Sequence, residues 1–405
     1  MKNEIKKPQR IGVMIVGLGG AVATTAVAGM ELLRQEAIGT EGLPLAALAD
    51  SRSVENLVAY SDLIFGGWDL SADDLSAAAA VHDVLTLEQH RLAAPALAQI
   101  TPLPACGNPE FCRNIGGANV IEAENHRAAI AVVRSQIAEF RRRCECQSVV
   151  VINLASTEKF VEKNIEAFSS LKSFEQALDT DSPEIAPAMI YAYSAIAEGA
   201  AYGNFTPSVA ADIPALVEFA EQCGVAIAGK DGKTGQTMMK TALAPAFRTR
   251  ALKVSGWYST NILGNRDGLA LSDADSLKSK IATKGSVLDD ILGYQVEDHI
   301  VDIRYYRPRG DNKEAWDNID VTGFLGQAMQ IKINFLCRDS ILAAPLVIEI
   351  ARLLELAQRR GESGVQEQLS VFFKLPQLRD DSNDKPEHAL HKQEQMLLDW
   401  LANTA

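Results

Sequence analysis

A short apolar run that ends in a glycine turn, Ile11 to Gly20 (IGVMIVGLGG), limits the possible folds of this chain most strongly. The run is typical of a buried strand, and the alanine-rich residues 21–37 that follow suit a helix lying close to a sheet. Glycines in such a turn allow the backbone to approach a phosphate, whose charge then lies at a helix N-terminus. The stretch therefore predicts the first strand, turn and helix of a dinucleotide-binding fold, although glycine pairs also occur in ordinary turns.

Further strand-like segments alternate with helical ones along the first part of the chain. We expect strands at residues 43–50 (LPLAALAD), 149–156 (VVVINLAS) and 224–229 (GVAIAG). The second of these is continuously apolar, as parallel strands covered on both faces tend to be. Helices between such strands predict an α/β fold with a Rossmann-like, doubly wound parallel sheet.

The pattern changes after residue 241, where strand-like segments follow one another with fewer helical intervals. They are residues 252–260, 299–310 and 328–338. This texture predicts a separate α+β unit, and helical periodicity returns from Ser340 to the end of the chain. We therefore divide the chain into residues 1–240, 241–344 and 345–405, and expect the last part to rejoin the first.

Composition and charge argue against several classes of function. The 405 residues carry a formal net charge of −13, whereas nucleic acid requires a basic face. We see no signal peptide and no apolar stretch of the ~20 residues that span a membrane. The six cysteines are dispersed and form no zinc-ligand set. The expectation is a cytoplasmic protein with reduced thiols, no membrane or nucleic-acid partner and no structural metal.

This acidic chain nevertheless gathers lysines between Ser276 and Asp290 (SLKSKIATKGSVLDD). Lys280 and Lys284 would share one face of a helix, where like charges repel by a few tenths of a kcal/mol. A solvated helix face is the simpler explanation of such a run. Counted together with the acids and the further lysine of the same region, these lysines would also suit oxyanion stabilisation and proton transfer. These acids and the further lysine are Asp267, Asp311, Lys313 and Asp339.

Two turns could bind a cofactor. Gly17, Gly19 and Gly20 lie in the first, but the usual third glycine is missing there. Asp50 closes the expected second strand, where an acid could bind ribose hydroxyls and disfavour a 2′-phosphate, or could equally cap a helix. In the second turn (GKDGKTGQT, residues 229–237) a Walker A loop is excluded, because glutamine follows the last glycine. A plain turn explains this segment equally well.

In this order, the segments resemble the myo-inositol-1-phosphate synthase family. The resemblance covers most of the chain and rests on FGGWDLS at Phe65, NVIEAENHR at Asn119, VVVINLASTEKF at Val149, GKDGKTGQT, LGNRDG at Leu263, SKIATKGSVLDD, HIVDIRYYRPRGDNK, CRDSILAAPL and HKQ at His391. It implies NAD as cofactor, a Rossmann-like domain over residues 1–240, an inserted catalytic and tetramerisation domain over 241–344, and a helical return over 345–405. It also implies a homotetramer that converts D-glucose 6-phosphate to 1D-myo-inositol 3-phosphate in inositol and phospholipid biosynthesis.

The resemblance also assigns site residues. The implied catalytic set is Lys280, Lys284, Lys313, Lys392, Asn265, Asp267, Asp311 and Asp339. With the turn residues above, the candidate cofactor-binding set is Gly17, Gly19, Gly20, Ala21, Val22, Asp50, Ser156, Asp231, Thr234 and Thr237. The chain departs from the family at GGAVA (residues 19–23, usually GGNNG), at Arg266 (usually Asn) and at Ser156 (usually Asn). These departures concern nucleotide binding and leave the lysines in place.

The implied reaction explains why lysines are needed. NAD+ oxidises C5 of the sugar phosphate, C6 then enolises and attacks the C1 aldehyde, and the NADH formed first reduces the remaining ketone. Each intermediate develops negative charge on oxygen, which preorganised ammonium groups stabilise. Our hypothesis places Lys280, Lys313 and Lys392 at the reacting oxygens, Lys284 at the substrate phosphate, and Asp311 and Asp339 as partners of lysines or sugar hydroxyls.

Two other functions stay open on sequence grounds. One is an NAD-dependent dehydrogenase that releases an oxidised sugar phosphate and NADH. The other is a nucleotide-binding regulator without catalysis, which would have no need of the lysine and aspartate set. The sequence also leaves open whether a mono- or divalent cation is required.

Overall fold

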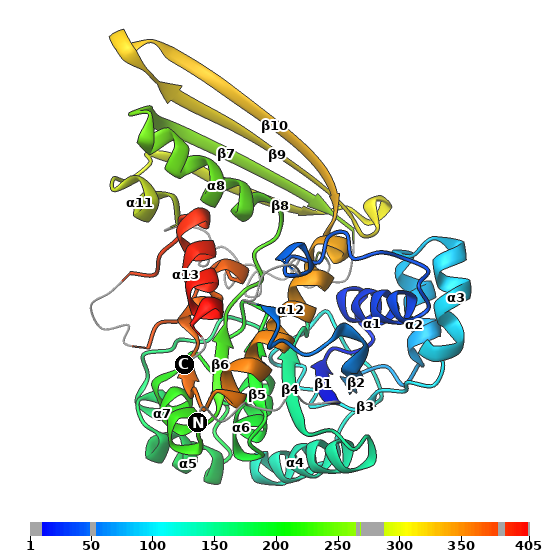
Figure 1. Cartoon of the computed structure of the whole chain (residues 1–405). Coiled ribbons are helices and arrows are strands. Elements are labelled where there is room, and N and C mark those ends of the chain that lie inside the picture. Colours follow the sequence, from blue (N-terminus) through cyan, green and yellow to red (C-terminus); the bar gives the residue numbers. More distant parts are fainter. Residues whose placement is uncertain (1–9, 49–53, 265–267, 269–286, 380–384, 404–405) are drawn as a thin grey trace.

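The chain folds around two β-sheets, which lie at opposite ends of the molecule (Figure 1). The computed structural model describes residues 10–48, 54–264, 268, 287–379 and 385–403. The larger sheet has seven strands in the order β11-β6-β5-β4-β1-β2-β3, and all its paired strands are parallel. The strands are β1 (Ile11–Val16), β2 (Leu63–Asp69), β3 (Leu103–Pro104), β4 (Ser148–Asn153), β5 (Ala201–Asn204), β6 (Ala226–Gly229) and β11 (Gly364–Val365).

Helices cover both faces of this sheet, which confirms the doubly wound α/β prediction. Successive residues of β1 alternate between two hydrophobic cores, because side chains of a strand point to opposite faces. Val13 packs with helices α1 and α12, and Met14 packs with α4 and α6 on the other face. The helices around the sheet are α1 (Ala21–Arg34), α2 (Leu75–His82), α3 (Leu87–Leu97), α4 (His126–Arg143), α5 (Leu171–Asp179), α6 (Pro187–Ala197), α7 (Pro214–Cys223) and α12 (Asp339–Arg359).

The prediction of a strand at residues 43–50 is wrong. Turns and the short 3-10 helix η1 (Ala46–Leu48) occupy the described part of this segment. Leu43 and Leu45 are buried because they join the core beside α12 from a loop, and the Leu45 N–H donates to Glu349 Oε1 of α12 at 3.2 Å. The second strand of the fold is instead β2, which ends at Asp69. Asp50 lies outside the described residues.

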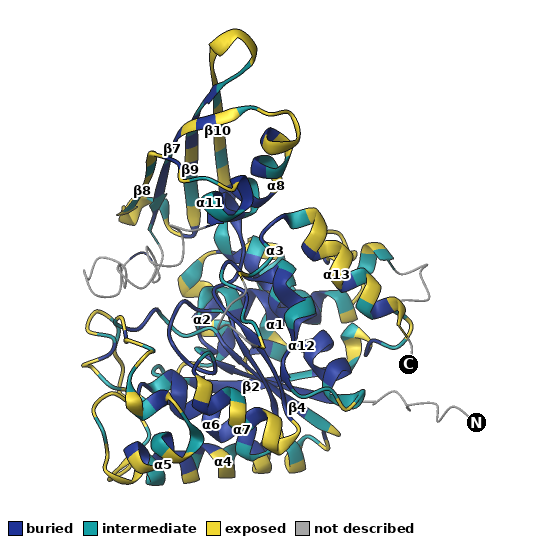
Figure 2. Cartoon of the chain, turned by 90° about the vertical axis from the view of Figure 1, so that its left-hand side faces the viewer, coloured by how far each residue is buried: buried dark blue, intermediate teal, exposed yellow. Residues whose placement is uncertain are grey.

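The smaller sheet has four strands in the order β10-β9-β7-β8, with β7 and β8 parallel and the other pairs antiparallel. Its helices α8 and α11 cover one face, whereas the strands also carry exposed residues, which face away from these helices (Figure 2). This second sheet confirms the α+β unit predicted from the sequence. The elements are β7 (Lys253–Leu263), β8 (Asp298–Tyr305), β9 (Asn312–Thr322), β10 (Ala328–Arg338), α8 (Gly235–Thr249) and α11 (Val287–Leu292).

Two helices connect the sheets. α8 begins after β6 of the larger sheet and packs on β7 and β9, while α12 begins at the end of β10 and packs on β4, β5 and β6. The domain boundaries predicted at residues 240 and 344 fall inside these two helices. The boundaries themselves stay predictions. The C-terminal helix α13 (Leu390–Ala402) packs against α8 and the 3-10 helix η7 (Glu367–Phe372). None of the described helices is long and apolar enough to cross a membrane.

A buried lysine joins α8 to the smaller sheet. Lys240 Nζ lies 2.7 Å from His299 Nε2 on β8 and 5.7 Å from the centre of the Trp257 ring. The buried carboxylate of Asp317 accepts hydrogen bonds from Trp257 Nε1 and Ser259 Oγ nearby. Burial lowers the pKa of Lys240 to about 8, although Asp317 opposes this shift. The lysine is therefore a costly buried charge near neutral pH.

Lys240→Met should flatten the pH dependence of the free energy of unfolding. Between the folded pKa of about 8 and the unfolded value of about 10.4, the unfolded chain binds the extra proton, so stability rises with pH. The rise should amount to roughly 3 kcal/mol in the wild type. Urea denaturation between about pH 7 and about pH 10 measures it. The exposed Lys253 of the same sheet gives the control Lys253→Met, which should keep the wild-type slope, and an equal slope in Lys240→Met would contradict the expectation.

Candidate active site

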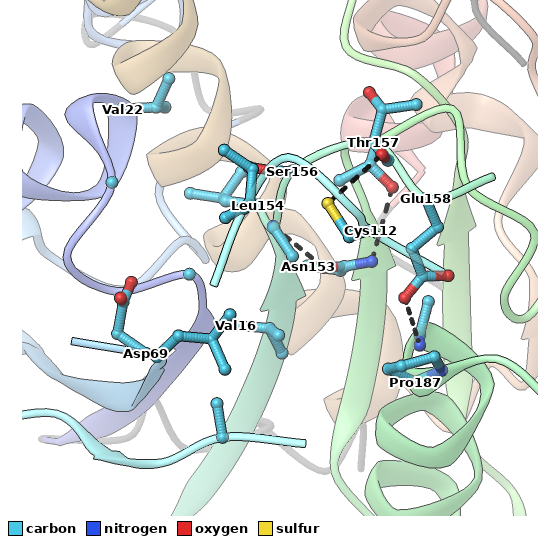
Figure 3. Close-up of a pocket in the computed structure, with 18 of the residues that line it drawn as sticks. Val16, Val22, Asp69, Cys112, Asn153, Leu154, Ser156, Thr157, Glu158 and Pro187 are labelled. Atoms are coloured by element: carbon cyan, nitrogen blue, oxygen red, sulfur yellow. Dashed lines mark hydrogen bonds between the residues drawn. The ribbon is translucent and has the colours of Figure 1, made fainter. Parts of the chain in front are cut away.

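A cavity of about 970 Å³ lies beyond the carboxyl ends of the parallel strands (Figure 3). This is where doubly wound sheets bind ligands, because the chain leaves β1 and β4 toward opposite faces and opens a crevice there. Its wall combines the turn after β1, the end of β2, and the loops after β3, β4, β5 and β6 with the starts of α6 and α12. Predicted site residues in this wall are Gly17, Gly20, Ala21, Val22, Ser156, Asp231, Thr234 and Asp339.

The turn after β1 forms a backbone cradle. Gly17 has φ +86°, and a Cβ at this position would lie 3.1 Å from backbone atoms of Ala155. Gly20 caps α1 and has no side chain to cover the first-turn N–H groups. Such N–H groups bind phosphate oxygens through the positive end of the helix dipole. The apolar side chains of Ala21 and Val22 add no polar contact, so recognition here depends on the backbone.

An acid holds this turn from the neighbouring strand. Asp69, the last residue of β2, accepts hydrogen bonds from the backbone N–H of Gly19 at 2.8 Å and of Ser71 at 2.9 Å. Its carboxylate also lines the cavity, beside the turn (Figure 3). Asp69 was not predicted as a site residue, because the second strand was expected earlier in the chain, at residues 43–50. Asp69 occupies the position that was predicted for Asp50, at the end of the second strand.

The loop after β4 supplies a buried acid. Glu158 lines the cavity, is 6% exposed, and its Oε1 accepts a hydrogen bond from the N–H of Ala188 in the first turn of α6 at 3.0 Å. Burial raises the pKa of Glu158 to about 8, against the opposing effect of the Ala188 hydrogen bond. The carboxyl is therefore protonated at neutral pH. Ser156 of the same loop lines the cavity as predicted for a cofactor-binding residue, whereas Glu158 was not among the predicted site residues.

The loop after β6 is held by two buried ion pairs. Lys374 Nζ donates to Asp231 Oδ1 at 2.7 Å, and both residues line the cavity. Lys230 lies 2.7 Å from Asp212, which also binds Lys163 at 3.1 Å. Burial opposes ionisation of Asp212, yet these two lysines outweigh it and hold the pKa of Asp212 well below its usual range. These two pairs fix the geometry of the segment and balance the charges of Lys230 and Asp231.

Predicted catalytic residues meet where the two sheets join. Lys313 Nζ of β9 lies 3.3 Å from Asp339 Oδ1 at the start of α12, and Thr234 Oγ1 donates to the same oxygen at 3.2 Å. Behind them, the buried Asp311 accepts a hydrogen bond from Ser340 Oγ at 2.7 Å. Thr237 lies one turn into α8 and is buried. Thr234 and Asp339 thus line one end of the cavity, and the Lys313 ammonium and the Asp311 carboxylate lie behind them, in contact with Asp339 and Ser340.

Other predicted residues are not brought to this cavity. Lys392 lies on α13 with its side chain 60% exposed, and its Nζ is 2.8 Å from Glu387 Oε2. Gly19 contacts Asp69 rather than the cavity itself. Asn265, Asp267, Lys280 and Lys284 lie outside the described residues. Among the residues that the structure does describe, no three His, Cys, Asp or Glu side chains are grouped to hold a metal ion.

Comparisons with known proteins point to one family. The family model described as myo-inositol-1-phosphate synthase matches residues 46–402. The chain is 41% identical over 421 residues to inositol-3-phosphate synthase 1 of Bacteroides thetaiotaomicron, covering 100% of this chain and 97% of that protein. It is 31% identical over 405 residues to inositol-3-phosphate synthase of Saccharomyces cerevisiae, covering 88% and 75% respectively.

Solved structures give the same result. The crystal structure of inositol-3-phosphate synthase from Caenorhabditis elegans has a TM-score of 0.90 and 28% identity, covering 98% of this chain and 86% of that one. A myo-inositol-1-phosphate synthase-related protein from Thermotoga maritima has a TM-score of 0.77 and 26% identity, covering 97% and 98%. Both sheets are therefore common to this chain and its structural relatives.

Proposed function

Because this chain belongs to the myo-inositol-1-phosphate synthase family, we propose that it converts D-glucose 6-phosphate to 1D-myo-inositol 3-phosphate with NAD as cofactor. The family assignment confirms the resemblance predicted from the ordered motifs. One observation of the structure supports the activity most directly: a single cavity runs from a glycine turn suited to a dinucleotide to Asp339, which binds Lys313.

The turn after β1 and the end of β2 fit a dinucleotide. Gly17 leaves no room for a side chain against Ala155, and the first-turn N–H groups of α1 suit a pyrophosphate. Asp69 can accept hydrogen bonds from ribose hydroxyls, and its negative charge disfavours a 2′-phosphate. When bound, NAD accepts a hydride from the sugar and returns it. At this end of the cavity, the backbone N–H groups of the turn and the Asp69 carboxylate would hold the cofactor in place.

The junction of the sheets suits the sugar phosphate. The Lys313 ammonium can stabilise negative charge on the substrate oxygen as C6 enolises and attacks C1, since a preorganised cation lowers such barriers in a site that excludes water. Asp339 and Thr234 would hold this lysine and sugar hydroxyls in place. Asn265, Asp267, Lys280, Lys284 and Lys392 complete the proposed catalytic set.

We extend the proposal to the assembly and location of the protein. The open face of the smaller sheet exposes Ile300, Trp316 and Leu336, which are 48%, 39% and 63% exposed. Apolar side chains gathered on one sheet face favour contact with another chain. This supports the homotetramer that the family resemblance implies, which sedimentation analysis tests directly. A cytoplasmic location belongs to the same proposal.

Product analysis separates the three candidate functions. The purified protein is incubated with glucose 6-phosphate and NAD+, with and without added K+ or Mg²⁺, while phosphorus NMR and NADH absorbance are followed. We expect inositol phosphate without net NADH, because the hydride is returned to the ring. NADH formed in step with substrate loss would identify a dehydrogenase. If neither product nor NADH forms, the protein is the non-catalytic, nucleotide-binding regulator. The incubations with and without added ions test whether a cation is required.

A further inference from the structure

Lys233 is a buried lysine whose ammonium faces away from the cavity. It lies in the loop after β6, directly before the cavity-lining Thr234, and is 4% exposed. Its Nζ donates a hydrogen bond to Oε1 of Gln393 on α13, a residue 160 positions along the chain that is 0% exposed. The cavity loop and the C-terminal helix are therefore joined by one buried hydrogen bond.

Gln393 also makes hydrogen bonds at the start of α13. Its Nε2 donates to the backbone carbonyl of Glu387 at 2.5 Å, and its own N–H donates to the carbonyl of Ala389 at 3.1 Å. Ala389 is the N-cap residue and has no side-chain acceptor to close the helix. The lysine and the glutamine together thus fix the first turn of α13, which carries Lys392.

The contact between Lys233 and Gln393 carries the cost of a buried charge that its partner does not neutralise. Its partner Gln393 is neutral, and burial lowers the pKa of Lys233 to about 7. Burial and, after it, the Lys233 charge lower the pKa of the neighbouring His388, whereas Asp290 of α11 and Glu387 raise it. An apolar side chain of similar length would avoid the cost of a buried charge. Such an apolar side chain could not, however, donate a hydrogen bond to Gln393.

We propose that Lys233 is a positioning residue for Lys392: it holds the first turn of α13 through Gln393 and so fixes the backbone from which Lys392 reaches the substrate. The inference rests on the proposed function, in which Lys392 contacts a reacting oxygen. Lys392 pairs with Glu387 at 2.8 Å in the structure, so its side chain must exchange this partner for substrate while the helix stays in place. Precise placement matters here because a shift of about 1 Å costs about a hundredfold in rate.

Loss of either partner should therefore impair turnover to the same extent. Lys233→Met and Gln393→Leu should each lower kcat by about a hundredfold, and the double variant should be no slower than the slower single variant, since the two residues act as a unit. Gln395→Leu is the matched control, because Gln395 is exposed on the same helix and binds Asp399 of that helix. NAD affinity should be unchanged in all four. Additive losses in the double variant, or a normal kcat in Lys233→Met, would overturn the proposal.

The split between kcat and KM gives a readout that a merely structural contact would not change. In Lys233→Met the loss should fall on kcat, with the KM for glucose 6-phosphate near the wild-type value, because Lys392 is proposed to act on charge that develops only in the transition state. An unchanged kcat with a raised KM would contradict the positioning role.

Hydrogen exchange of α13 separates failure of this inference from failure of the proposed function. Lys233→Met should speed exchange in the first turn of α13 relative to Gln395→Leu, whatever reaction the protein catalyses. If the wild type makes no inositol phosphate, the proposed function fails and the positioning role for Lys392 fails with it, even where exchange is faster. If the wild type is active and Lys233→Met changes neither exchange nor kcat, the positioning role alone is refuted.

Discussion

Lys313→Met should reduce the formation of inositol phosphate by about 10²–10³-fold, the usual cost of removing one preorganised group that stabilises an oxyanion. The side chain is 12% exposed and its Nζ lies 3.3 Å from Asp339 Oδ1, so its position is fixed before substrate arrives. Methionine keeps much of the volume and removes the charge. The loss should fall on kcat, because negative charge develops on the substrate oxygen only during the reaction. Phosphorus NMR of the product measures it.

A matched lysine and the cofactor site control this experiment. Lys332 is exposed on β10 of the same sheet and pairs in register with Asn318, so Lys332→Met should leave turnover unchanged. Binding of NAD+ to Lys313→Met should stay at the wild-type level, because Gly17 and Asp69 line the cavity and Lys313 does not. Normal turnover of Lys313→Met would remove this lysine from the catalytic set.

The parallel sheet could be predicted from sequence because its central strands have a simple signature. β1 is apolar throughout and β4 is apolar from Val149 to Ile152, since both faces of the sheet are covered. β2 was missed because the glycines of FGGWD lower its strand propensity. Gly67 is nevertheless required, since it has φ +144° and a Cβ there would lie 2.0 Å from the Ile15 carbonyl oxygen. That contact arises only once β2 pairs with β1, so local sequence could not reveal it.

The candidate site was predictable where it follows strand ends and not where it depends on buried charge. Lys313 and Asp339 were expected near one another, and they meet because β9 and β10 pair in register up to the start of α12. The contact between Lys233 and Gln393 joins segments 160 positions apart and has no local signal. The same holds for Glu158, whose raised pKa follows from burial against α6. Such groups are identified only when the packing around them is known.

Removal of the Asp69 carboxylate should weaken cofactor binding. Asp69→Ala deletes the acceptor for the N–H groups of Gly19 and Ser71 and the predicted acceptor for a ribose hydroxyl. Each hydrogen bond to a charged group contributes about 1.5–3 kcal/mol, so the Kd for NAD+ should rise by about 10- to 100-fold or more. Isothermal titration measures this, and Asp73→Ala, an exposed acid in the following loop, should retain wild-type affinity.

Asp69→Asn separates the charge of this residue from its hydrogen bonds. The amide oxygen can still accept from Gly19, so the turn should keep its shape, whereas the negative charge that disfavours a 2′-phosphate is gone. The ratio of NAD+ to NADP+ affinity should therefore fall in Asp69→Asn while affinity for NAD+ falls less than in Asp69→Ala. An unchanged ratio would show that Asp69 holds the glycine turn only, and that another residue distinguishes the two nucleotides.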